Sequence, residues 1–477
     1  MGRNNQERRR TKHAARKRTP PGAPAWMRHE PPGRDHSTST GAAGPRQAHR
    51  LAPDEGAVLA ARATVLARGA GEALVRGDGS SAESALDALV ALAPGPAELR
   101  IVQQAIIDLL RTAIRAAWKR GWQPRDVYEV LGRGDDRLAT ELAGDVMADD
   151  LAGYARPLVD PRWFEQLSGI GASVWWPADS TWPRARSAAS SANASSAGWA
   201  LVLEAAVGLL GRLNRLGTLQ AFLPLPGHAS ATAAPPAHVD DSVLHRVRQM
   251  LAQAESTSFE AEADSFTAAA QRLMARYSID QAMLAATGQV GPATGPTGRR
   301  IWVARPYVKE KVVLLNEVAD ANRARAVWAK ELDMVSLLGH EPDLDAVETL
   351  YTSLLVQATR AMYAEGKQVA SWGGSGTRGF RQSFLAAYAL RIGERLRAAS
   401  VEETQAAAAE ATRQGGRALV PILQAREEAV DGFTEELFPG LVHHRVSAGS
   451  DPQGWAKGRQ AADRAELADG TGNRLGR

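Results

Sequence analysis

The residues best placed for chemistry lie between positions 367 and 397, where basic and aromatic side chains gather and acids are scarce. The candidates for binding nucleic acid or phosphate are Lys367, Arg378, Arg381, Tyr388, Arg391 and Arg395. A Gly-Gly-Ser-Gly sequence starts at Gly373 and leads into a predicted helix, whose first N–H groups can face an anion. Guanidinium groups bind phosphate oxygens and aromatic rings stack on bases. The segment therefore predicts a phosphate or nucleic-acid site.

The spacing of the same segment predicts a helix over 380–399. At 100° per residue one face holds the apolar side chains Phe380, Phe384, Tyr388, Ile392 and Leu396. Three of the candidate arginines fall on or beside this face, where cations need partners. In the alternative interpretation they pair with acids of the preceding helix, such as Asp345 or Glu348, and stack on the aromatic rings. The glycine-rich loop lacks the Gly-Lys-Ser/Thr of a P-loop.

Catalytic or metal chemistry has weaker candidates. His340, Glu341 and Asp343 cluster before a predicted helix, and Glu260 and Asp264 are four residues apart on another. These groups suggest a metal-dependent hydrolase or nuclease as an alternative function. Helix-start roles and stabilisation of a helix dipole explain the same residues, and the pair His443-His444 offers too few metal ligands. We therefore expect no metal and no cofactor, and leave any catalytic residue unassigned.

Charge is distributed unevenly along the chain. Residues 1–50 hold 12 basic and 3 acidic side chains, a net charge of +9, so the rest carries −5 within a total of +4. A disordered basic tail is expected there, because hydrophobic residues are sparse. No stretch reaches the roughly 18 apolar residues of a membrane helix, no signal peptide is apparent, and cysteine is absent. These features indicate a cytoplasmic protein, and the excess of arginine over lysine suggests an actinobacterial source.

Helical periodicity dominates residues 51–223. Apolar side chains at spacings of three and four predict a helix over 98–119, and Gly121 separates it from a second helix over 124–131. The pair fits either an ordinary helical hairpin, which we favour, or a DNA-reading helix-turn-helix. The tryptophans between positions 163 and 182 are interpreted mainly as a plug for this domain. Stacking on bases is the alternative.

Residues 240–287 predict a helical hairpin. One helix covers 241–254, and a second begins near Glu260. The spacing of Ser278 and Gln281 predicts the start of a third, short helix. The segment RQMLAQAESTSFEAEADSFTAAAQRLMARYSID at 248–280 resembles the bacterial and phage domain of unknown function 2786, through its Leu-Ala-x-Ala-Glu end and its Gln-x-Leu-Met-x-x-Tyr run. The resemblance implies no established activity.

The C-terminal half predicts the order β-α-β-β-α-α, with strands near 301–303, 325–328 and 334–338 and helices over 308–321, 342–363 and 380–399. The fold class is therefore mainly α with a small α+β C-terminal domain. The expected division is a basic tail at 1–50, a helical domain at 51–223, a linker at 224–239, the hairpin at 240–287, a linker at 288–299, the α+β domain at 300–400, and a helical, partly disordered segment at 401–477.

The function favoured by the sequence is a non-catalytic, nucleic-acid-associated binding protein that uses the basic tail and the Arg/aromatic face. DNA or RNA is the expected partner, and no membrane is expected. The alternatives are the metal-dependent hydrolase or nuclease above and a structural or adaptor protein that binds another protein. A protein partner and the oligomeric state stay undefined.

Overall fold

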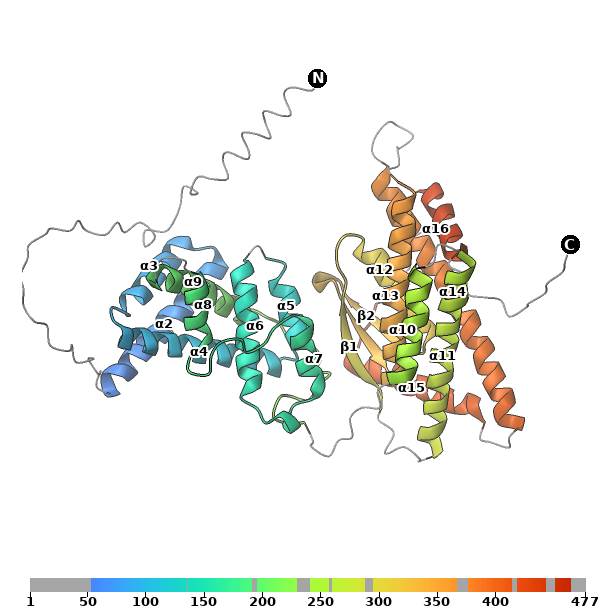
Figure 1. The fold of residues 1–477 in the computed structure, drawn as a ribbon, viewed down its shortest axis with the longest axis horizontal. Coiled ribbons are helices and arrows are strands. Elements are labelled where there is room, and N and C mark those ends of the chain that lie inside the picture. Colours follow the sequence, from blue (N-terminus) through green and yellow to red (C-terminus); the bar gives the residue numbers. More distant parts are fainter. Residues whose placement is uncertain are drawn as a thin grey trace, which may run out of the picture. The chain divides into compact units, whose positions relative to one another are not determined.

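The chain separates into two compact units, which divide at residue 231. The computed structural model describes residues 53–134, 136–190, 195–229, 241–256, 260–287, 295–366, 376–413, 418–442 and 451–464. Both units are mainly helical, and a small sheet is found in the second (Figure 1). The predicted fold class, mainly α with a small α+β C-terminal part, is confirmed. Within the described residues no helix has the length and apolarity to span a membrane.

Unit 1 is built from helices around one core. Its elements are α2 (Pro53–Arg76), α3 (Gly79–Ala91), α4 (Pro96–Lys119), α5 (Pro124–Leu131), α6 (Arg137–Ala152), the 3₁₀ turn η3 (Arg156–Leu158), α7 (Pro161–Gly169), α8 (Trp182–Ser190) and α9 (Ser195–Asn214). The core joins apolar faces of α2 to α9. Trp163 and Trp182 are fully buried in it, which confirms the plug interpretation for these two side chains. Trp175 is half exposed.

The turn between α4 and α5 is fixed by tertiary contacts. Gly121 has φ +85°, and a Cβ there would collide with the carbonyl oxygen of Leu219. The indole of Trp122 donates to the carbonyl of Gly217 at 2.8 Å. In α5, Arg125 lies 2.5 Å from Glu129. The helices α4 and α5 therefore form a helical hairpin that is held against the segment after α9. Arg125, the basic residue near the start of α5, already pairs with an acid.

Unit 2 combines helices with three antiparallel strands. Its elements are α10 (Asp241–Ser256), α11 (Glu260–Thr287), β1 (Thr297–Trp302), α12 (Val308–Ala321), β2 (Arg325–Ala329), η4 (Lys330–Leu332), β3 (Met334–Gly339), α13 (Glu341–Ala364), α14 (Thr377–Arg413), α15 (Leu419–Leu437) and α16 (Pro452–Arg464). The strand order is β1-β3-β2. All six residues of β3 are buried, as expected for a central strand. The predicted order β-α-β-β-α-α is observed.

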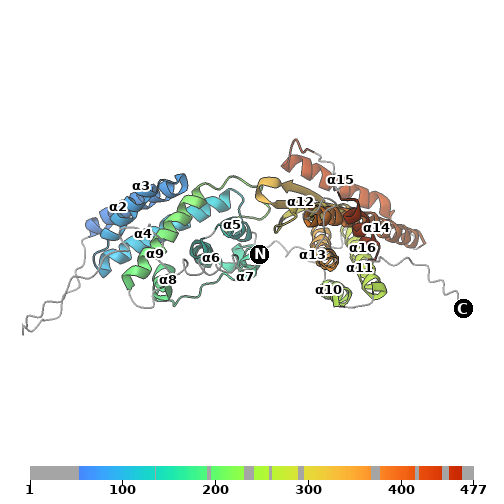
Figure 2. The same cartoon turned by 90° about the horizontal axis from the view of Figure 1, so that it is seen from above.

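The hairpin α10–α11 belongs to the core of unit 2. The two helices lie side by side in both views (Figures 1 and 2). Val247 and Leu251 of α10, with Ala270 and Met274 of α11, share one hydrophobic cluster with α12, α13, α14 and β3. The segments at 240–287 and 300–400 therefore bury their apolar surface together, which contributes about 25 cal/mol for each Å² removed from water.

Three predicted boundaries differ from the structure. The third helix expected at Ser278 is wrong, because α11 continues without a break to Thr287. The Ser278 hydroxyl bonds to Asp343 in place of capping a helix. Strand β1 begins at Thr297, earlier than predicted, and α14 runs through position 400 to Arg413. Local spacing could not reveal these continuations, because long-range contacts stabilise them.

Helix α16 docks on α14 through two glycines. Gly454 and Gly458 are one turn apart, and a Cβ on either would collide with the carbonyl oxygen of Phe380 or Phe384. The backbones therefore touch, and only glycine permits that approach. Within the segment expected at 401–477 to be helical and partly disordered, α16 is thus a packed helix, with Ala462 fully buried.

Gly458→Ala should lower the free energy of unfolding of unit 2 by about 1–3 kcal/mol, the usual cost of overpacking a tight contact. Urea denaturation followed by circular dichroism measures the loss. Gly432→Ala in α15 is the matched control, because nothing lies within 4 Å of its added Cβ. The control should be neutral or stabilising by up to about 1 kcal/mol, through helix propensity. Equal effects of the two substitutions would contradict the docking role of Gly458.

Candidate functional site

The apolar half of the predicted Arg/aromatic face forms part of the core. Phe380, Phe384 and Tyr388 are each at most 1% exposed, and Ile392 and Leu396 are fully buried. The rings of Phe380 and Phe384 lie 6.2 Å apart. These aromatic side chains therefore pack α14 against its neighbours and offer no surface for stacking on a base.

Two of the candidate arginines are fastened to α16. Arg391 donates to Glu394 at 2.7 Å and also pairs with Asp463. Arg395 donates to the backbone carbonyls of Ala462 and, at 3.3 Å, Asp463. The hydrogen bond from Arg391 lowers the pKa of the Glu394 carboxyl. Both arginines therefore contact acceptors on α16. Nothing in the sequence indicates that α16 lies beside this face.

The acids named as alternative partners of these arginines bind another residue. Asp345 and Glu348 lie 2.9 and 3.0 Å from Arg299 of β1. Burial opposes the charge of Arg299, but the surrounding carboxylates outweigh it and raise its pKa. Arg397 of α14 instead pairs with Glu317 of α12 at 2.7 Å. The expected pairing with Asp345 or Glu348 is therefore wrong, and of the three arginines on the face Arg391 pairs instead with acids on α14 and α16.

The other end of the face remains open to solvent. Arg378 is exposed, and among the described residues it makes no ion pair. The guanidinium carbon of Arg381 lies 4.6 Å from the ring centroid of Tyr363, which is 52% exposed. Lys367 and the Gly-Gly-Ser-Gly loop lie outside the described residues. A binding role for the six candidates stays a prediction, and the structure brings only Arg378 and Arg381 to this exposed end.

The residues considered for metal chemistry do not converge within the described parts of the chain. Glu341 lies 3.2 Å from Arg299, whereas Asp343 faces a different network. The described residues contain no group of three or more potential metal ligands. The side chains of Glu260 and Asp264, and the pair at 443–444, lie outside what is described.

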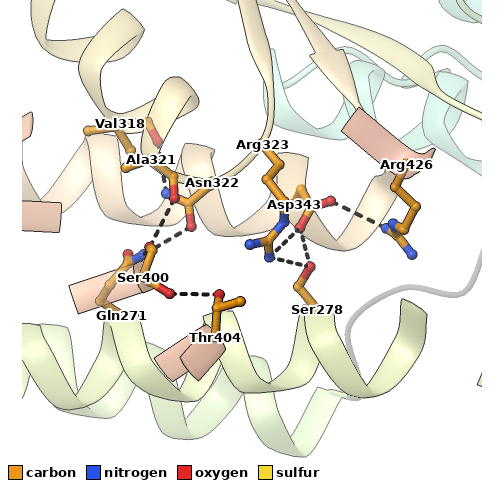
Figure 3. A network of polar contacts seen from close by, with 10 residues as sticks. All are labelled: Gln271, Ser278, Val318, Ala321, Asn322, Arg323, Asp343, Ser400, Thr404 and Arg426. Atoms are coloured by element: carbon orange, nitrogen blue, oxygen red, sulfur yellow. Dashed lines mark hydrogen bonds and ion pairs between the residues drawn. The ribbon is translucent and has the colours of Figure 1, made fainter. Parts of the chain in front are cut away.

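A buried polar network connects α11 with residues of α12, α13, α14 and α15 (Figure 3). Gln271 is fully buried, and its amide donates to Asn322 at 3.1 Å and to Ser400 at 3.2 Å. Ser400 in turn donates to the carbonyl of Ala321 at 2.9 Å. Burying an amide costs free energy unless it is hydrogen-bonded, so the pairing specifies how α11, α12 and α14 meet.

Two turns along α11, Ser278 reaches a second part of the network. Its hydroxyl donates to Asp343, which is 2% exposed, and accepts from Arg323 at 3.1 Å. Nη2 of Arg323 lies 3.9 Å from Oδ1 of Asp343, and Nη2 of Arg426 lies 3.3 Å from Oδ2. Figure 3 shows the two arginines on opposite sides of the carboxylate. Two guanidinium groups thus share one carboxylate.

The electrostatics of this pair of arginines are unfavourable. Burial lowers the pKa of Arg426, Asp343 opposes that shift, and the positive charge of Arg323 adds to it. Arginine remains protonated in proteins, so the site keeps two positive charges against one negative charge.

The backbone at Arg323 is also unusual. Arg323 has φ +56°, in the left-handed region that favours glycine. It follows the C-cap Asn322 of α12, and the N–H of Ala324 donates to the carbonyl of Ala319 at 3.0 Å. This is the Schellman arrangement, in which glycine is the usual residue at the position of Arg323. An arginine there costs about 1 kcal/mol relative to glycine, and its side chain enters the network around Asp343.

The family match covers α10 and most of α11, and α11 contributes Gln271 and Ser278 to this network. A family model described as protein of unknown function (DUF2786) matches residues 242–281. The resemblance stated from the sequence is confirmed. The match includes both Gln271 and Ser278. The curated proteins and the solved structures yield no significant match to the chain.

Sequence reasoning found parts of this network without joining them. Gln271 lies in the DUF2786 pattern, and Asp343 lies in the polar cluster before a predicted helix. Arg323 and Arg426 gave no signal, because the chain has 57 basic residues and their partner Asp343 is 20 and 83 residues away. One clue was available: Gln271 and Ser278 are seven residues apart and so share a helix face.

Unit 1 contains a separate open cleft of about 630 Å³. Tyr154, Arg156 and Phe164 line it together with aliphatic side chains of α6 and α7. The guanidinium carbon of Arg156 lies 4.7 Å from the ring centroid of Phe164. Apolar walls with one guanidinium suit a flat, negatively charged molecule.

Asp343→Asn should destabilise unit 2 by about 3 kcal/mol in phosphate-free buffer, because it leaves Arg323 and Arg426 without a buried counter-charge. Urea unfolding monitored by tryptophan fluorescence and circular dichroism measures the loss.

Asp345→Asn, two residues along α13, is the matched control. Its partner Arg299 keeps Glu341 and Glu348, so the control should lose about 1 kcal/mol or less. If the Asp343 variant is as stable as the control, Asp343 does not hold the two arginines in place.

Proposed function

We propose that the chain is a non-catalytic, nucleic-acid-associated binding protein. The observation that carries this proposal is the exposed end of α13 and α14, where Arg381 stacks on the half-exposed ring of Tyr363 next to the exposed Arg378. An arginine held over an aromatic ring offers a phosphate contact and a stacking surface at one place.

The pairing of the remaining arginines narrows this interface. Arg391, Arg395 and Arg397 have partners on neighbouring helices, so their guanidinium groups are occupied. The part of α14 that supports contact with nucleic acid is therefore its first turns, before Phe384. This is shorter than the face considered from sequence.

The basic segment at 1–50 supplies a second, less specific attraction. Its net charge of +9 favours any polyanion through release of counterions. Binding through such a segment alone falls steeply with salt and shows little preference for base or strand. A contribution from Arg381 and Tyr363 instead favours single strands, whose bases are free to stack.

Arg378→Ala/Arg381→Ala should weaken binding of labelled single-stranded DNA or RNA by roughly tenfold and reduce the slope of log K against log salt by about one to two, as expected for two lost phosphate contacts. Fluorescence anisotropy across a salt series, with the full chain and with a chain that starts at Leu51, measures both quantities.

Arg391→Ala/Arg459→Ala is the matched control, because it removes the same charge from two arginines that both contact Glu394. It should change affinity by less than about threefold. Equal losses in both double variants would reduce the effect to net charge. Loss of all binding on removal of residues 1–50 would show that the folded units do not take part.

A further inference from the structure

The network around Asp343 carries more positive than negative charge. Among the described residues, Asp343 is the carboxylate partner of both Arg323 and Arg426, and no other acid pairs with either. By contrast, Arg325 beside them has Glu427 and Asp431 to itself, at 3.0 and 2.7 Å. Buried charges in proteins are normally paired, so one positive charge in the site is left over.

Hydrogen-bond donors are in surplus at the same place. Each guanidinium has five N–H donors. The described residues give Arg426 a single contact, at 3.3 Å, and Arg323 a hydrogen bond to Ser278 with a longer contact to Asp343. The buried Nε of Arg323 has no partner among them. An acceptor with several oxygens would satisfy these donors.

The position of Arg323 favours a role beyond packing. The left-handed conformation at the end of α12 suits glycine, yet this chain places there a long cationic side chain that reaches Ser278 and Asp343. A non-glycine residue held in this conformation often marks a functional site. Among the described residues Arg323 makes one hydrogen bond, to Ser278, and its Nε has no acceptor.

The side chains of the two arginines are not completely buried. The side chains of Arg323 and Arg426 are 15% and 16% exposed, whereas Asp343 between them is 2% exposed. Each arginine side chain is therefore partly exposed, whereas the carboxylate that both contact is buried.

We propose that Arg323 and Arg426 form a binding site for a small oxyanion of the phosphate class, with Ser278 as a positioning residue and Asp343 as a partial counter-charge that competes with the anion. Guanidinium groups bind tetrahedral oxyanions through paired N–H donors, and such an anion has more acceptor oxygens than a carboxylate. The anion neutralises the surplus charge. The site lies against the DUF2786-matching helix α11 and is independent of the proposed nucleic-acid interface.

The first measurement is a thermal-shift titration of the full chain with sodium phosphate, against sodium chloride at equal ionic strength, with isothermal calorimetry for the affinity. We expect a saturable rise in Tm with phosphate but not with chloride. Arg323→Gln and Arg426→Gln should each lower phosphate affinity at least tenfold. Arg325→Gln is the matched control and should keep the response, because its own acids neutralise it. No phosphate-specific shift in the wild type, or equal losses in all three variants, would overturn the proposal.

A variant with the opposite expected effect guards against simple unfolding. Asp343→Asn removes the competing negative charge and keeps both arginines, so phosphate should bind roughly tenfold more tightly and restore more of the lost Tm than in the wild type. Unchanged or weaker phosphate binding in the folded Asp343→Asn protein would contradict the proposal.

The source of the phosphate group is distinguished by a separate comparison. A 5′-phosphorylated oligonucleotide and its 5′-hydroxyl counterpart are each competed against inorganic phosphate. Selective displacement of phosphate by the phosphorylated strand assigns a nucleic-acid end, whereas displacement by neither assigns a free small phosphate. Displacement of phosphate by both strands alike would place the ion on a general basic surface and overturn the proposed site.

Discussion

A carboxylate buried among helices must be neutralised, and in unit 2 this requirement falls on Asp343. The side chain is 2% exposed and receives Ser278 from α11, Arg323 from the end of α12 and Arg426 from α15. Each partner comes from a different element, so the buried charge is stable only when all of them are assembled. Apolar packing allows helices to slide, whereas this geometry fixes which residues meet.

The amide of Gln271 applies the same constraint two turns away on α11. It joins α11 to the end of α12 and to α14 through Asn322 and Ser400. The contacts of Gln271 and Ser278 therefore fix how α11 is rotated about its axis and how far it is shifted along that axis, relative to the hydrophobic cluster that it shares with α12 to α14. The DUF2786-matching segment ends just after Ser278, so the family pattern includes the two residues that determine how its second helix docks.

Much of the helical framework could be predicted from sequence, because periodicity and caps are local. The expected helices over 308–321 and 124–131 have the boundaries that the structure shows, and the strands expected near 325–328 and 334–338 correspond to β2 and β3. The candidate site was harder. Ser278 has the spacing of a helix cap, and only the buried Asp343, 65 residues later, shows that its hydroxyl is used elsewhere. Pairings across such separations leave no periodic signal.

Arginine content alone is a poor guide to function in this chain, and the ratio of cations to acids at each place is a better one. Arg391 and Arg397 each meet two carboxylates, and Arg299 meets three, so these residues stabilise packing without leaving charge to spare. Arg323 and Arg426 divide one carboxylate between them. Several N–H donors of these two guanidinium groups have no acceptor among the described residues, and an anion is the simplest group that would accept from them.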